Sequence, residues 1–145
     1  MPEALIIRTA AVFGGHRGQS FPEKILARAE EGLPLRVVTD QRVNPTYTKD
    51  LAVAALGLAD RAVEGVVHVV SDDCCGWDVF AAAVLEEFQR PVAVQPIPSA
   101  ELALAARRPR NGCLASTRVG PLRSWREALH EWAIDRKQRL GLADK

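Results

Sequence analysis

Polar side chains that could bind a ligand gather at two places in the sequence. Asp40, Gln41 and Thr46 lie in the loop that follows a short apolar run, and Arg108 and Asn111 lie in a basic segment. Ligands of open α/β sheets bind in loops that follow strands. Carboxylate, amide and hydroxyl groups can form hydrogen bonds with a polar ligand, and a guanidinium can pair with an anionic group through two charge-assisted hydrogen bonds. A simpler interpretation stays open: the first loop satisfies its own backbone, and the second is a solvated basic loop.

Other kinds of chemistry have little support in the sequence. Cys74, Cys75 and Cys113, together with the histidines, lack the spacing of metal ligands, and Ser116 has no base at a recognisable spacing. Three cysteines, two of them adjacent, do not make a disulfide framework. We therefore expect a reducing compartment, no metal site and no nucleophilic catalysis.

A glycine-rich stretch, Gly14 to Gly18, lies between a predicted strand and a predicted helix, in the outline of a dinucleotide-binding motif. The spacing of the glycines does not match G-x-G-x-x-G, and Pro22 removes one N–H from the first helical turn. We therefore interpret the stretch as a loop rather than a cofactor site.

Composition limits the class of protein. The chain has 145 residues, a net charge of +1, 48% hydrophobic and 26% charged residues, which is typical of one globular domain. The charge gives no reason to expect nucleic acid or an anionic membrane as partner. Apolar stretches such as 52–59 are far shorter than the roughly 20 residues of a membrane span, and no signal-peptide pattern comes before the first strand. We expect a cytoplasmic protein.

Short apolar runs alternate with helical patterns, which indicates a layered α/β fold. The first run should be a fully buried strand, Thr48 should cap the second helix, and Pro96 should confine its strand to a sheet edge. The predicted strands cover about 4–8, 35–38, 66–70 and 92–97. The predicted helices cover about 21–29, 48–58 and 77–88, a short turn from 99, and 124–136.

Read together, several motifs are similar to one family. They are Ile7-Arg8-Thr9-x-x-Val12-Phe13-Gly14, Asp40-Gln41-x-x-x-Pro45-Thr46-Tyr47-x-x-Asp50-Leu51-Ala52, Gly65-Val66-Val67-His68, Pro96-Ile97-Pro98-Ser99, Arg108-Pro109-Arg110-Asn111 and Trp125-Arg126-Glu127-Ala128-Leu129. In this order and spacing they resemble the C-terminal half of dTDP-4-dehydrorhamnose reductases, of the extended short-chain dehydrogenase/reductase superfamily.

The resemblance implies a partial Rossmann-like sheet with a small substrate-binding α/β subdomain. Residues 1–145 would then form a single sugar-nucleotide-binding domain, without the N-terminal half that binds NADPH or NADH. The family's Tyr-x-x-x-Lys pair is missing, because the residue four places after Tyr47, the sole tyrosine, is Leu51 and not lysine. We therefore predict that the chain has no catalytic residue of its own and does not reduce dTDP-4-dehydro-rhamnose alone.

The resemblance also implies a binding site for a dTDP-sugar. Family members usually carry a large aromatic residue where Ala11 stands and an asparagine where Ser20 stands, so the sugar bound could differ. The implied substrate-binding residues are Arg17, Ser20, Phe21, Asp40, Gln41, Thr46, Arg108 and Asn111.

Two other interpretations stay open. Proteins similar to these reductases also act as non-catalytic regulatory subunits of methionine adenosyltransferase, and the chain could also be a truncated reading frame. If it is a natural subunit, we expect a separate cofactor-binding half or a homo-oligomer as partner.

Overall fold

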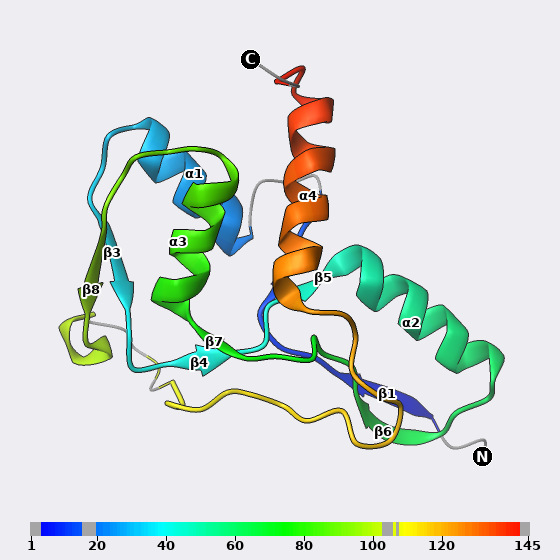
Figure 1. Cartoon of the computed structure of the whole chain (residues 1–145). Helices are drawn as coiled ribbons and strands as arrows, with labels where there is room; N and C mark the ends of the chain where they lie inside the picture. Colours follow the sequence, from blue (N-terminus) through cyan, green and yellow to red (C-terminus); the bar gives the residue numbers. More distant parts are fainter. Residues whose placement is uncertain (1–3, 16–19, 103–105, 107, 143–145) are drawn as a thin grey trace.

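The computed structural model describes residues 4–15, 20–102, 106 and 108–142, as four helices and eight strands (Figure 1). The helices are α1 (Phe21–Glu30), α2 (Thr48–Asp60), α3 (Trp77–Glu87) and α4 (Trp125–Arg139), with a 3-10 turn at Ser99–Glu101. The strands are β1 (Leu5–Arg8), β2 (Val12–Phe13), β3 (Leu35–Val38), β4 (Arg42–Val43), β5 (Thr46–Tyr47), β6 (Gly65–His68), β7 (Cys75–Gly76) and β8 (Val94–Ile97). Every longer predicted element is present.

The strands pair across long stretches of chain. β1 pairs with β6, β2 with β5 and β3 with β8, all parallel, while β4 and β7 are antiparallel. Parallel neighbours need crossover connections, and the helices supply them. Pro96 lies in β8, which pairs only with β3 in the part of the chain that is described, so the expected edge position is confirmed.

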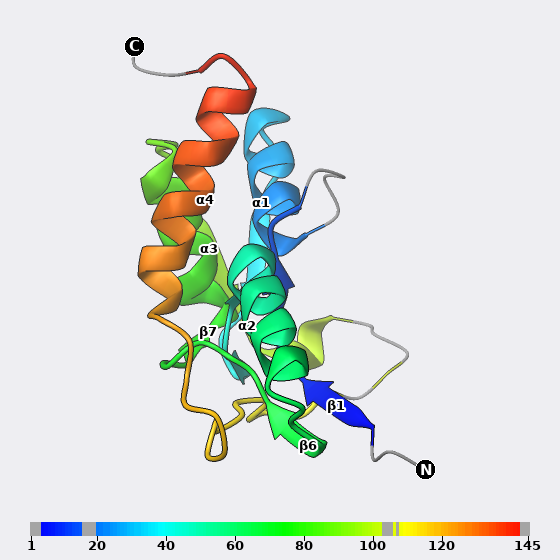
Figure 2. The same cartoon turned by 90° about the vertical axis from the view of Figure 1, so that its right-hand side faces the viewer.

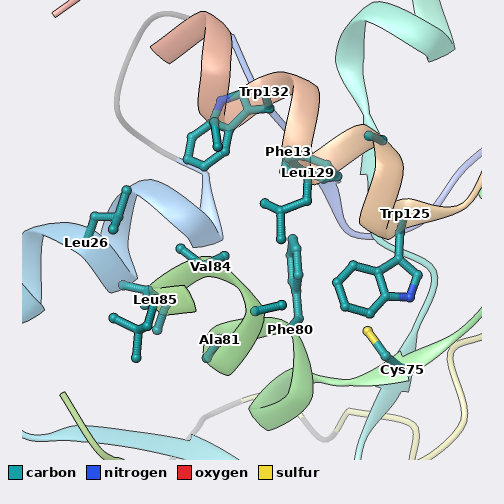
Figure 3. Packing of buried hydrophobic residues seen from close by; sticks show 14 of the residues in the cluster. Phe13, Leu26, Cys75, Phe80, Ala81, Val84, Leu85, Trp125, Leu129 and Trp132 are labelled. Atoms are coloured by element: carbon teal, nitrogen blue, oxygen red, sulfur yellow. The ribbon is translucent and has the colours of Figure 1, made fainter. Parts of the chain in front are cut away.

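The main core lies between α1, α3 and α4 (Figures 1 and 3). Phe80 on α3 has no exposed surface, and its ring centroid lies 5.4 Å from that of Phe13, 5.5 Å from that of Phe21 and 5.5 Å from that of Trp125. Trp132 on α4 contacts the same cluster through Phe13. Both tryptophans of α4 are buried in this core. Because these rings come from β2 and three helices, the cluster fixes how the helices sit against the strands.

A smaller core joins α2 to β1 and β6, beside the first (Figure 2). Leu58 and Val67 are buried there. The expectation that β1 is buried on both faces is wrong, since Ile6 is 51% exposed and its neighbour Val66 is 38% exposed. β1 has one paired edge among the described residues, and α2 covers only one face of the pair.

The ends of two helices are set in different ways. Gly32, with φ of +67°, lies just past the end of α1, as its conformational freedom predicts. The expected cap at Thr48 is wrong: α2 begins at Thr48, its N-cap is Tyr47, and no side chain caps it. Asp50, in the first turn, instead accepts two hydrogen bonds from Arg123, at 2.8 and 2.9 Å.

The aromatic cluster predicts a large effect of core truncation. Phe80→Ala should lower the free energy of unfolding by about 3–5 kcal/mol, because it removes a fully buried ring and leaves a cavity. Urea titration followed by tryptophan fluorescence measures this. Val79→Ala is the matched control, because Val79 is 41% exposed on the same turn of α3. Equal losses for the two variants would contradict the assigned core.

Candidate functional site

The two segments singled out from sequence lie side by side. The backbone N–H of Arg42 donates to Arg110 O, and Gly112 N–H donates to Arg42 O, both at 2.8 Å. Arg42 thus forms a parallel β-bridge with Asn111 on one side and an antiparallel strand pair with Gly76 of β7 on the other. In Figure 1 the segment after residue 108, in yellow, runs along β4 and β7.

The outer surface of this junction is basic. Arg42, Arg108, Arg110 and Asn111 are all exposed. Arg42 was missed in the sequence analysis; its position directly after the Asp40-Gln41 pair was the available signal. The Arg42 guanidinium donates to Cys74 O at 3.3 Å, so the Arg42 side chain lies against the residue that precedes β7.

Asp40 has partners of its own. Its carboxylate accepts hydrogen bonds from the Ser99 backbone N–H, at 2.9 Å, and from the Ser99 hydroxyl, at 2.8 Å. The hydrogen bond from the Ser99 hydroxyl is the main reason that the pKa of Asp40 lies below its usual value. The carboxylate holds the start of the 3-10 turn, and the charge of Arg110 also favours its ionised form.

Gln41 and Thr46 lie beneath the surface. Gln41 is 9% exposed and Thr46 is fully buried, with its hydroxyl donating to Asn44 O at 3.1 Å. Thr46 is also part of β5, which pairs with β2. Both residues are thus buried, whereas Arg42, Arg108 and Arg110 are exposed.

Asn44 joins three pieces of chain, and the sequence analysis missed it. The side chain is 2% exposed; its amide donates to Ser71 O at 3.1 Å and to Asp73 O at 3.2 Å, and its oxygen accepts from Leu114 N–H at 2.8 Å. Both partner segments are remote in sequence, so no local pattern pointed to this role. Asn44 ties the segment after Asn111 to the turn before β7.

A disulfide joins the same two segments. Cys74 and Cys113 are bonded, with Cα atoms 6.1 Å apart and a separation of 39 positions in sequence. The expectation that the cysteines form no disulfide is wrong, because the segment after Asn111 runs beside β7 and brings Cys113 to Cys74. Cys75, the next residue, is free and buried, and burial raises the pKa of its thiol to about 12.

The remaining predicted residues lie at the start of α1. Arg17 is outside the described residues. Ser20 is the N-cap of α1, and its buried hydroxyl has no partner among the described residues. Phe21 packs on Trp77, with centroids 4.6 Å apart, and so reaches the N-terminal end of α3 directly after β7.

The loop after β1 has two further features. The sequence analysis gave Thr9 no role and treated Ala11 only as a departure from the family pattern. The hydroxyl of Thr9 is buried with no partner in the described part of the chain. Ala11 has φ of 41°, a left-handed conformation that is rare for alanine and common near binding sites. Both lie at the carboxyl end of a parallel strand, where α/β sheets bind ligands.

The described residues do not fit a dinucleotide site. A Cβ at Gly14 would lie 2.6 Å from Thr48 Oγ1 and 2.6 Å from a ring carbon of Tyr47, so this glycine allows the loop to pack against α2 rather than against a pyrophosphate. Pro22, which lacks an N–H, is buried in the first turn of α1. Among the described residues no group of three or more His, Cys, Asp or Glu side chains could hold a metal ion.

Tyr47 does not have the properties of a catalytic acid. Its hydroxyl donates to Asp135 Oδ2 at 3.2 Å, and burial, followed by this hydrogen bond, raises its pKa to about 12. Lys49, two residues on, is paired with Glu131 at 2.6 Å. A tyrosine acid needs a cation that lowers its pKa, and the carboxylate beside Tyr47 does the opposite.

Comparison with known proteins then decides the family. The model of the RmlD substrate binding domain matches residues 1–138. The chain belongs to this family. It is 38% identical over 138 residues to the spore coat polysaccharide biosynthesis protein SpsK of Bacillus subtilis, covering 92% of this chain and 48% of SpsK. It is 38% identical over 135 residues to dTDP-4-dehydrorhamnose reductase of Mycobacterium tuberculosis, an alignment that covers 88% of this chain and 44% of that reductase.

A solved structure supports the same assignment. The dTDP-4-dehydrorhamnose reductase of Bacillus anthracis, in complex with NADP, superposes with a TM-score of 0.85 at 27% identity, over 90% of this chain and 48% of that one. The RmlD substrate-binding domain described here therefore matches the C-terminal portion of these reductases and spans about half the length of the curated relatives. The expected fold class, part of an extended short-chain dehydrogenase/reductase, is confirmed.

Within the described residues, no helix of this RmlD substrate-binding domain is long and apolar enough to cross a membrane.

Tyr47 makes a pH-dependent prediction. It is the single tyrosine, so the rise in absorbance near 295 nm should report its titration alone, with a midpoint of about pH 12 in the folded chain. In guanidinium chloride the midpoint should return to about 10. Because the pKa is raised on folding, this contribution to stability is complete below pH 10 and is lost as the pH rises towards 12.

Asp135→Asn tests the cause. Removing the carboxylate charge should lower the folded-state midpoint while leaving the unfolded one unchanged. A midpoint near 10 in the folded wild type would contradict the assigned environment.

Proposed function

We propose that this chain is the nucleotide-sugar-binding portion of a dTDP-4-dehydrorhamnose reductase-like enzyme. The observation that carries the proposal is the junction of the Asp40–Thr46 loop with the Arg108–Asn111 segment through the backbone of Arg42. The family match and the names of the relatives supply the substrate class, a dTDP-sugar.

The charges at the junction suit a diphosphate. Arg42, Arg108 and Arg110 carry guanidinium groups at the surface, and Asp40, the carboxylate beside them, is engaged by Ser99. Guanidinium groups bind phosphate oxygens through paired charge-assisted hydrogen bonds. We place the diphosphate over these arginines, and the sugar and base towards Asn111 and the loop after β1.

The reducing chemistry would be supplied from outside this chain. NADPH or NADH would bind to a separate cofactor-binding half, because the described residues form neither a dinucleotide site nor a tyrosine acid with a lowered pKa. The edge of β1 that has no partner among the described residues, with Ile6 exposed beside it, is the surface we assign to that half, since another parallel strand would cover it. A cytoplasmic location and pairing with a second copy stay as expectations.

Calorimetric titration with dTDP tests the binding claim. The wild type should release or absorb heat on binding, and Arg108→Ala should weaken the affinity by roughly tenfold to a hundredfold, the usual cost of a hydrogen bond to a charged group. Arg90→Ala is the charge-matched control, because Arg90 pairs with Glu30 at an exposed site on other elements.

Equal affinities in the two variants would refute the arginine site. No binding of dTDP by the chain, either alone or with a cofactor-binding half supplied in trans, would refute the function. Co-purification with another enzyme in that case would favour the regulatory-subunit interpretation, and a cofactor-binding sequence in frame upstream would favour a truncated reading frame.

Because the proposal assigns the cofactor and the catalytic acid to a separate half, it predicts no turnover by this chain alone. Oxidation of NADPH, followed at 340 nm with dTDP-4-dehydro-rhamnose, should not exceed the rate without protein. Addition of a cofactor-binding half should restore it if the two halves associate. Turnover by the chain alone would show that a catalytic acid lies within it.

A further inference from the structure

We propose that Asn44 and the Cys74–Cys113 disulfide form a clamp that positions residues 108–114, so that ligand binding by this segment depends on the thiol redox state. The proposal rests on the proposed function, because it assigns regulation to the same arginine site. Asn44 acts as a positioning residue and the disulfide as the part of the clamp that can open.

The non-covalent half of the clamp is the buried amide of Asn44. Both of its N–H groups are used, on Ser71 O and Asp73 O, and its oxygen accepts from Leu114 N–H. A buried amide with every contact satisfied fixes the relative position of the segments it joins. Through it, the segment after Asn111 is held against the turn that leads into β7.

The covalent half connects the neighbours of the same residues. Cys74 follows Asp73, and Cys113 precedes Leu114, so the disulfide and Asn44 tie the same two segments one residue apart. On the ligand side of Cys113, the segment is held by the two backbone hydrogen bonds to Arg42 and by the Asn111 side chain, which accepts from Cys113 N–H at 3.1 Å. Opening the disulfide leaves the exposed arginines on a less constrained stretch of chain.

The disulfide can be reached by small thiols, since Cys74 and Cys113 are each only partly buried. A dithiol thiolate attacks one of the two sulfurs, a mixed disulfide forms and the other cysteine leaves as thiolate. The second thiol of the reagent then breaks the mixed disulfide, so two electrons and two protons pass to the protein and the reagent becomes a cyclic disulfide. Glutathione disulfide reverses the change and releases two molecules of glutathione. Cys75 is buried and stays outside this exchange.

Amide hydrogen exchange of the full chain tests the clamp without any ligand. After reduction with dithiothreitol, the amides of Gly112, Cys113 and Leu114 should exchange about tenfold faster or more, while those of α3 are unchanged. Cys113→Ser should show the fast rates with or without reductant. Cys75→Ala, the control, should respond to reductant as the wild type does.

Affinity for dTDP tests the consequence. Reduction and Cys113→Ser should each weaken binding by about tenfold, the usual scale for ordering a loop on binding. Asn44→Asp keeps an acceptor for Leu114 but places carboxylate oxygen against two carbonyls, so it should weaken binding even when oxidised. Asn44→Ser, which keeps one donor, should recover part of the affinity.

The outcomes separate this proposal from the proposed function. If no form binds dTDP, the proposed function fails, and exchange rates alone decide the clamp: acceleration confined to residues 112–114 supports it. Unchanged rates on reduction, equal affinities of the oxidised and reduced chain, or three free thiols after treatment with glutathione disulfide, where the re-formed disulfide would leave only that of Cys75, would overturn it.

Discussion

The site depends on the backbone of Arg42. Its N–H and C=O both bond to residues 110–112, while β4, which contains it, pairs with β7. Backbone groups at such a junction need partners, and here the partners come from a stretch almost 70 positions later in the chain. The position of the basic surface is thus set by strand pairing, and the exposed side chains only add charge to it.

The aromatic core is what holds β7 in place for this pairing. α3 begins directly after β7, and Trp77 and Phe80 on its first turns pack on Phe21 of α1. A close-packed cluster of rings tolerates little movement. Because β7 leads into this cluster, the cluster and the clamp at Asn44 fix the two ends of the same short region, one by packing and the other by hydrogen bonds.

The longer elements could be predicted from the sequence because their signals are local. The apolar spacing of α1 and α3 and the glycine after α1 are readable within a few residues. The four two-residue strands could not be predicted, since two residues show no periodicity and exist only through their partners. The same reason hid Asn44 and the pairing of Cys74 with Cys113. The segments of the candidate site were found through family motifs, but which side chains reach the surface was not: Thr46 is buried, whereas Arg42 is exposed.

The sequence of β1 is typical of a strand buried on both faces, yet one face of β1 is exposed. Leu5, Ile6 and Ile7 are apolar on both faces of the strand, a pattern typical of a parallel strand buried in a larger sheet. In the described part of the chain, one face and one edge of β1 are covered, and Ile6 is half exposed. An apolar strand with a free edge is a place where another strand can add. The pattern therefore agrees with relatives about twice as long, and it is compatible with the proposed division, in which this chain would hold the sugar nucleotide and a separate half would pack along the edge of β1.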